Sequence, residues 1–198
     1  MQMRPQLFSW SALLFLFVLT APARADTSPY GYYRYPTVYG DQVVFNSEGD
    51  LWMAPLSGGV ARRLTLAQGP EVFPMFSPDG KWIAFSGNYD GNMDVYVMPA
   101  SGGEPRRLTY RPGADYVTAW TADGKIVFRA NSEVGQGRTW LCYTVSPEGS
   151  YPEKLPIDEA ALVTFEPNGD RVAYNRCTHN YNGYGWWKRY RGGMAEPI

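Results

Sequence analysis

A motif that recurs every 40 to 45 residues constrains the fold of this 198-residue chain more than any other feature. Its clearest copy is Phe76–Phe85, which reads Phe-Ser-Pro-Asp-Gly-Lys-Trp-Ile-Ala-Phe. Related copies occupy Trp120–Phe128 and Phe165–Tyr174, and a looser one occupies Val38–Phe45. A fixed period of this length is typical of proteins built from stacked supersecondary units.

Each unit has a second half that also repeats. Asp50–Gly59 is followed by Arg-Arg-Leu-Thr, and Asp94–Gly103 is followed by the same four residues, whereas the third copy, Thr139–Pro156, is degraded. Asp-Gly and Asn-Gly between apolar runs favour two-residue hairpin turns in which both central residues have positive φ, and Gly-Gly favours a second such turn. The second unit therefore predicts four strands, at about Phe73–Phe76, Trp82–Ser86, Asp94–Pro99 and Arg106–Thr109.

Four short strands every 40 to 45 residues is the period of a β-propeller blade. We therefore expect an all-β chain, a partial β-propeller of four-stranded antiparallel blades. The predicted blades are 34–65, 73–109 and 116–156, with a half blade at 162–198. One blade cannot bury both of its faces alone, so we expect the aromatic residues Trp52, Trp82, Trp120, Phe85 and Phe128 to pack between blades. Propellers typically close with four to eight blades, so we expect this segment to be the N-terminal part of a longer protein.

The first 25 residues resemble a secretory signal peptide rather than part of the fold. Arg4 is followed by an apolar run from Leu7 to Leu19 and by Ala23-Arg-Ala25, an A-x-A cleavage pattern. An uncleaved membrane anchor is the alternative, although the run is shorter than the roughly 20 apolar residues that span a bilayer. We expect export to the periplasm or the extracellular space, with 26–33 as a linker.

Composition limits the partners and the chemistry. The formal net charge is −1, which argues against the basic footprint of a nucleic-acid-binding protein. Two cysteines and one histidine are too few for a recognisable zinc site, and no cofactor is predicted. Cys142 and Cys177 either form a disulfide or remain two separate buried thiols; the sequence leaves both possible.

The units resemble TolB-type and tricorn-type propeller repeats. Two segments, Glu48–Thr65 and Trp187–Met194, are similar to the first propeller of tricorn-type proteases, and the resemblance covers about residues 34–196. Such enzymes carry two N-terminal propellers, a PDZ-like domain and a C-terminal serine protease core. The resemblance implies that this chain belongs to the first propeller, that its partners are peptides, proteins and the remaining domains of the parent chain, and that the full-length protein is a homo-oligomer.

Four candidate sites can be weighed from the residues. His179 lies in a Gly/Asn-rich stretch with no Gly-x-Ser-x-Gly motif in the chain, so we predict a surface loop and no catalytic residue. Asp90, Asn92 and Asp94 have the spacing that opens a calcium loop, but the glycine and glutamate such a loop requires are missing, which favours an Asx turn and no metal.

The other two candidates are cationic. Arg62-Arg63 and Arg106-Arg107 recur at equal places in their units, so we expect a structural role in which one arginine of each pair covers the neighbouring blade. Trp186–Gly193 interleaves aromatic and basic residues on a loop between two strands. Lys188, Arg189 and Arg191 are therefore weak candidates for binding peptides, against the alternative of a packed structural loop.

Two functions remain. The favoured one is the N-terminal propeller segment of an exported tricorn-like serine peptidase, acting as a scaffold or gate for peptide substrates while a C-terminal core outside this segment performs proteolysis. The alternative is a non-catalytic periplasmic TolB-like propeller that binds partner proteins.

Overall fold

The computed structural model describes residues 31–131, 140–166, 169 and 171–175. These residues form three four-stranded antiparallel sheets and one two-stranded sheet, as the repeat predicted. The first sheet contains β1 (Arg34–Tyr39), β2 (Gln42–Ser47), β3 (Asp50–Pro55) and β4 (Arg62–Arg63). The second contains β5 (Glu71–Phe76), β6 (Trp82–Gly87), β7 (Asp94–Pro99) and β8 (Arg106–Arg107). The third contains β9 (Asp115–Trp120), β10 (Ile126–Ala130), β11 (Leu141–Val145) and β12 (Glu153–Lys154), and β13 (Val163–Phe165) pairs with β14 (Val172–Tyr174). We call these sheets blades 1 to 4.

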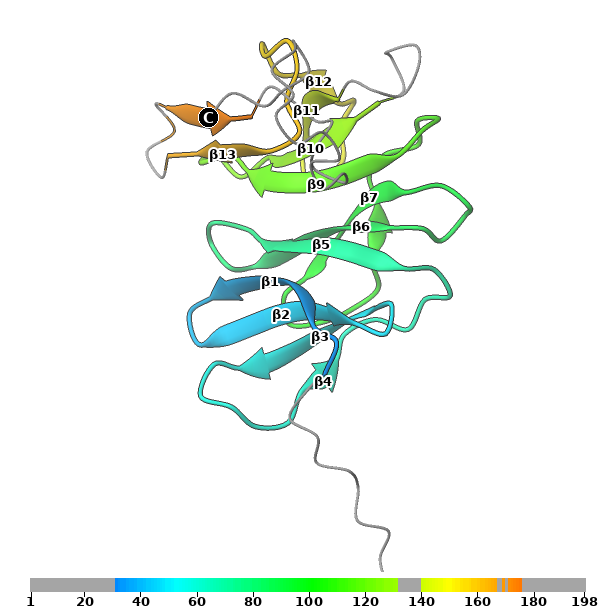
Figure 1. Cartoon of the computed structure of the whole chain (residues 1–198), viewed down its shortest axis with the longest axis vertical. Helices are drawn as coiled ribbons and strands as arrows, with labels where there is room; N and C mark the ends of the chain where they lie inside the picture. Colours follow the sequence, from blue (N-terminus) through cyan, green and yellow to red (C-terminus); the bar gives the residue numbers. More distant parts are fainter. Residues whose placement is uncertain (1–30, 132–139, 167–168, 170, 176–198) are drawn as a thin grey trace, which may run out of the picture. The chain divides into compact units, whose positions relative to one another are not determined.

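Within each full blade the strands pair in chain order, so the first strand and the short fourth strand form opposite edges. The first strands of successive blades lie next to one another, β1 beside β5, β5 beside β9 and β9 beside β13 (Figure 1). This edge is the inner edge of the blades, and β4, β8 and β12 form the outer edge. The all-β partial propeller predicted from the sequence is thereby confirmed.

The hydrophobic core lies between the blades rather than within one of them. Alternation along β6 explains this, because Ile83 and Phe85 face blade 1 while Ala84 faces blade 3. Trp120 and Phe128 join the core between blades 2 and 3, and Trp82 packs against it when partly buried. The prediction for these aromatic residues is correct except at Trp52, which belongs to none of the core clusters and donates its indole N–H to the Ser47 carbonyl at 3.2 Å.

The predicted turn chemistry needs a correction. At Ser77–Trp82 only Gly80 has positive φ, and Asp79 does not. The Gly80 amide donates to the Ser77 carbonyl at 2.9 Å, and the Asp79 carboxylate accepts from the Lys81 amide at 3.1 Å, so the loop is an Asx-stabilised turn longer than two residues. A two-residue turn with positive φ at both positions instead occurs at Glu48-Gly49. The two Gly-Gly pairs of the repeats lie in longer loops, one between Pro55 and Arg62 in blade 1 and the other between Pro99 and Arg106 in blade 2.

Two further sequence predictions concern the cysteines and the N-terminus. Cys142 is a buried free thiol that donates to the Ala160 carbonyl at 3.4 Å, whereas Cys177 lies outside the described residues. The predicted signal peptide, 1–25, also lies outside them. Across the described ranges, no helix has the length and apolar character needed to cross a membrane.

Candidate functional site

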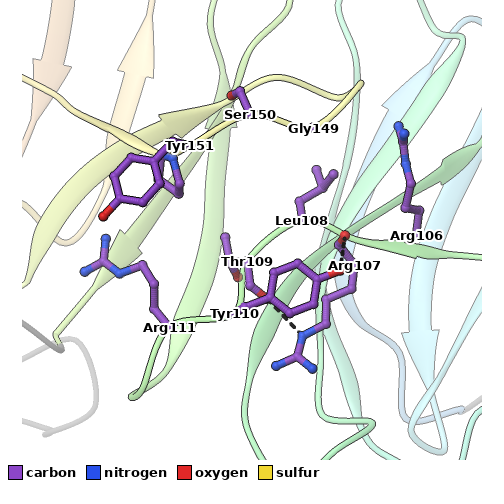
Figure 2. Close-up of a pocket in the computed structure, with 10 residues that line it drawn as sticks. Arg106, Arg107, Leu108, Thr109, Tyr110, Arg111, Gly149, Ser150 and Tyr151 are labelled. Atoms are coloured by element: carbon purple, nitrogen blue, oxygen red, sulfur yellow. Dashed lines mark hydrogen bonds between the residues drawn. The ribbon is translucent and has the colours of Figure 1, made fainter.

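A groove of roughly 470 Å³ opens at the outer edge between blades 2 and 3. One wall is the segment 106–111, which includes β8 and the residues after it, and the other is the loop 149–152 that precedes β12 (Figure 2). Two tyrosines line it that are unusually exposed for large aromatic residues, Tyr110 at 73% and Tyr151 at 90%. Among the described residues that line the groove, none carries a carboxylate.

Local contacts fix the first wall. Leu108 is buried and its amide donates to the Val95 carbonyl at 2.8 Å. The buried hydroxyl of Thr109 accepts from the Val95 amide at 2.9 Å. These contacts to β7 anchor the backbone, which leaves Tyr110 at the surface. Its hydroxyl donates to the Arg107 carbonyl at 3.3 Å, and the Arg107 guanidinium lies 4.6 Å from its ring centre (Figure 2).

The two arginines of each pair make different contacts, one with the next blade and one within their own blade, which agrees with the structural role predicted for them. The first arginine of each pair reaches the next blade. Arg62 donates to the Ser101 carbonyl at 3.3 Å, and Arg106 donates to the Glu148 carbonyl at 3.0 Å and to the Pro147 carbonyl. The second arginine stays within its own blade, where Arg63 pairs with Asp50 and Arg107 pairs with Asp94.

Asp94 is therefore the counterpart of Asp50 rather than part of an ion site. It is fully buried, 2.6 Å from the Arg107 guanidinium, and it accepts from Asn92 at 3.2 Å. Asp90 is exposed and pairs with the same arginine at 3.0 Å. Within the ranges that the structure describes, no group of three His, Cys, Asp or Glu residues is placed to hold a metal ion.

A second buried carboxylate stands at the junction of blades 1 and 2 and at that of blades 2 and 3, as the first residue of the inner strands β5 and β9. Glu71 accepts hydrogen bonds from the Leu51 amide at 3.1 Å, from the Thr65 hydroxyl and from the Tyr89 hydroxyl at 2.5 Å. Burial raises its pKa, and these hydrogen bonds oppose the rise. Asp115 is its counterpart between blades 2 and 3. It is fully buried, and burial raises its pKa to about 7 despite the neighbouring Thr109 hydroxyl and Arg111 guanidinium.

A row of aromatic rings begins on the inner strands β1, β5 and β9 and ends at Trp140, just before β11. The ring centres of Tyr35 and Phe73 are 4.3 Å apart, those of Phe73 and Tyr116 5.8 Å, and those of Tyr116 and Trp140 5.6 Å. The buried guanidinium of Arg129 lies 5.2 Å from the Tyr116 ring centre. Tyr35 and Phe73 have φ values of 51° and 54°, a region that non-glycine residues seldom occupy, and each precedes a proline. The inner edge thus holds its aromatic rings at a cost in backbone strain.

The residues predicted as weak peptide-binding candidates, Lys188, Arg189 and Arg191, lie outside the described residues, as does His179. The groove between blades 2 and 3 was missed by the sequence analysis, although a signal for it exists. The signal is a difference between two otherwise similar repeats. Arg-Arg-Leu-Thr is followed by Leu66 and Ala67 in the first unit but by Tyr110 and Arg111 in the second. This arrangement can bind a ligand, and the histidine of the chain, His179, lies outside the described residues.

Comparison with known proteins places these features in a family. The model of the tricorn protease N-terminal β-propeller domain matches residues 30–198. The chain belongs to this tricorn propeller family. Tricorn protease homolog 1 of Streptomyces coelicolor is 37% identical over 174 residues, which is 84% of this chain and 15% of that protein. The chain therefore spans only a small part of that tricorn relative's length.

Solved structures agree on the fold. The crystal structure of the tricorn protease superposes with a TM-score of 0.68 at 24% identity, covering 84% of this chain and 17% of that one. TolB from Acinetobacter baumannii superposes with a TM-score of 0.61 at 21% identity, covering 74% of this chain and 38% of that one. At these identities the two structures show a shared propeller architecture. The tricorn assignment rests on the family model and on the Streptomyces relative.

Proposed function

We propose that this propeller segment serves an exported tricorn-type serine peptidase as a scaffold and gate for its peptide substrates. Hydrolysis is assigned to a serine protease core that the described residues do not contain. The observation that carries the proposal is the family match over residues 30–198, joined to blades whose strand order and inner-edge stacking are those of a propeller. Association with the other protease domains, in a homo-oligomer, belongs to the same proposal.

Several features of the described residues support a scaffold role. The buried carboxylates and arginine pairs connect strands within single blades and across blade junctions. The exposed groove and the inner-edge aromatic row offer surfaces that a peptide can contact without being cleaved there. Export is supported by the signal-peptide pattern that ends at Ala25.

A covalent probe tests the proposal. The intact protein, expressed with its own N-terminus in a bacterial host, is separated into cytoplasmic and periplasmic fractions and treated with a serine-directed fluorophosphonate. We expect the mature protein in the periplasmic fraction to start at Asp26, and the label to map outside residues 26–198.

Two results would contradict it. A labelled serine within 26–198 would place the catalysis in the propeller itself. An intact protein that takes no label and cleaves no peptide would favour the non-catalytic, TolB-like module. Export and peptidase activity can also fail separately, because a labelled protein that stays in the cytoplasm would refute export and leave the peptidase assignment intact.

A further inference from the structure

The groove between blades 2 and 3 corresponds in sequence and strand pairing to the surface formed by residues 62–67 and 102–105 between blades 1 and 2, called the first groove by analogy. Comparing the two separates structural residues from additional ones. Blade 1 meets blade 2 through the same kind of outer edge, where Arg62 reaches the Ser101 carbonyl as Arg106 reaches the Glu148 carbonyl. Strand pairing aligns these positions, because Met53 pairs with Arg62 as Val97 pairs with Arg106. The structural contacts that hold one outer edge against the next blade are therefore present in both grooves.

The two grooves differ at four positions, and at three of them the second groove has gained a large side chain; the fourth difference is Gly103 against Ser150. Leu66 and Ala67 of the first groove correspond to Tyr110 and Arg111 of the second, since both follow Arg-Arg-Leu-Thr directly. Tyr96 pairs with Arg107 as Tyr143 pairs with Lys154, so Arg107 and Lys154 are corresponding residues. Glu104 and Tyr151 each lie three residues earlier, so Glu104 of the first groove corresponds to Tyr151 of the second. The second groove has thus gained two tyrosines and an arginine and has lost a carboxylate. Tyr110 and Tyr151 are exposed, so blade packing does not require them, whereas the Arg111 guanidinium also lies 4.2 Å from the Tyr143 ring centre and close to the buried Asp115.

We propose that this groove is a docking surface for an extended, acidic segment of a partner polypeptide. Tyrosine and arginine are the residue types that dominate binding energy at protein interfaces. Arg106 adds positive charge to a lining without carboxylates, and its guanidinium donates to the neutral backbone carbonyls of Pro147 and Glu148, just before the opposite wall. The segment is extended because exposed aromatic rings that line a groove suit a peptide without internal hydrogen bonds, as in polyproline recognition. The proposal holds whether or not the intact protein is a peptidase.

Fluorescence polarisation of the intact protein tests the ligand chemistry. The probe is a short fluorescein-labelled peptide of alternating glutamate and proline, and its control is the same peptide with lysine in place of glutamate. We expect saturable binding of the glutamate peptide, weakening as salt is added, and no saturable binding of the lysine peptide. Equal binding of both peptides, binding of neither, or a clear preference for a single-stranded oligonucleotide over the glutamate peptide overturns the proposal.

Exchange of the three large side chains tests the location. Y110L/R111A/Y151E gives the second groove the corresponding side chains of the first while keeping Ser150, and it is expected to weaken binding by about tenfold or more, the effect typical of losing several interface anchors. The reciprocal variant, L66Y/A67R/E104Y, is expected to add a second site and to double the bound peptide at saturation. It also keeps the test valid if the first variant fails to fold. Unchanged stoichiometry in the reciprocal variant, or unchanged affinity in a folded Y110L/R111A/Y151E, overturns the proposal.

Discussion

Glu71 and Asp115 stand 44 residues apart at the same position of consecutive blade junctions, yet their hydrogen bonding differs completely. The Glu71 carboxylate accepts three hydrogen bonds, whereas neither carboxylate oxygen of Asp115 accepts one from any described residue. Both side chains are fully buried. The shorter side chain of Asp115 therefore leaves a buried carboxylate that the fold satisfies less well at the second junction than at the first.

The first prediction follows from the pKa of Asp115, which lies at about 7 in the folded protein, against an ordinary value of 3.8. Between these two pH values the folded state binds a proton that the unfolded state releases, so the stability that this proton gives is present at low pH and is lost as the pH rises toward 7. The loss approaches ~4 kcal/mol at neutral pH, since each pKa unit corresponds to about 1.4 kcal/mol.

Asp115→Asn cannot ionise and should flatten this dependence. Urea unfolding, followed by tryptophan fluorescence at pH 5 and at pH 8, measures it. We expect the free energy of unfolding to fall between these pH values in the natural chain, and to fall clearly less in the variant. The raised pKa values of Glu71 and Asp94 act in the same direction and leave some residual slope. Identical slopes in the two proteins would show that Asp115 is not the group responsible.

The second prediction concerns a longer side chain at position 115. Asp115→Glu adds one methylene, which should bring a carboxylate oxygen toward the Val95 amide as Glu71 reaches the Leu51 amide at 3.1 Å. We expect a gain of about 1 kcal/mol at neutral pH, the usual contribution of a buried hydrogen bond. Equilibrium unfolding compares the variant with the natural chain. A loss of more than about 1 kcal/mol would mean that the junction has no room for the longer side chain.

The third prediction concerns the ion pairs. Arg107 neutralises the fully buried Asp94, whereas Asp50 and Arg63 are more exposed, with side-chain accessibilities of 8% and 41%. Arg107→Ala leaves a buried charge without its cation and should cost about 3–5 kcal/mol, and Arg63→Ala should cost clearly less. Asp94→Asn in the Arg107→Ala background should recover part of the loss. The four proteins are compared by chemical denaturation, and equal costs for the two arginines would argue against this account.

The structure also explains why the sequence predicts some of these features and not others. The Asp-Gly motif and the Arg-Arg-Leu-Thr motif each lie within a few residues, so their strands and turns could be located from local pattern. Glu71 and Asp115 could not be assigned, because Leu51 and Thr65, which bind Glu71, come from the preceding blade and no local pattern marks either acid. The two-residue turn predicted at Asp79 is wrong, because the Asp79 carboxylate accepts from the Lys81 amide and so stabilises a longer loop. Tyr110 and Tyr151 line one groove only because two blades meet there.

The fourth prediction uses Gly69, a position fixed by close packing. A Cβ atom at this residue would lie 1.6 Å from the backbone carbonyl oxygen of Asn88, so the loop before β5 must shift to accept alanine. We expect Gly69→Ala to cost about 1–3 kcal/mol. Gly91→Ala is the matched control, because no atom lies within 4 Å of its Cβ position and only its φ of +82° opposes the substitution. Thermal unfolding should place the control between the natural chain and Gly69→Ala.

The scaffold and gate role is the central claim, and substrate length tests it most directly. Tyr116 lies on β9 at the inner edge, within the aromatic row, and its ring centre lies 5.6 Å from that of Trp140. Peptidase activity of the intact protein is measured on a short fluorogenic peptide and on a long unfolded polypeptide, for the natural chain, for Tyr116→Ala and for the control Tyr110→Phe. We predict that Tyr116→Ala changes the KM for the long substrate several-fold and leaves hydrolysis of the short peptide unaltered. Equal changes for both substrates, or no change for either, would contradict a role for this propeller in controlling substrate access.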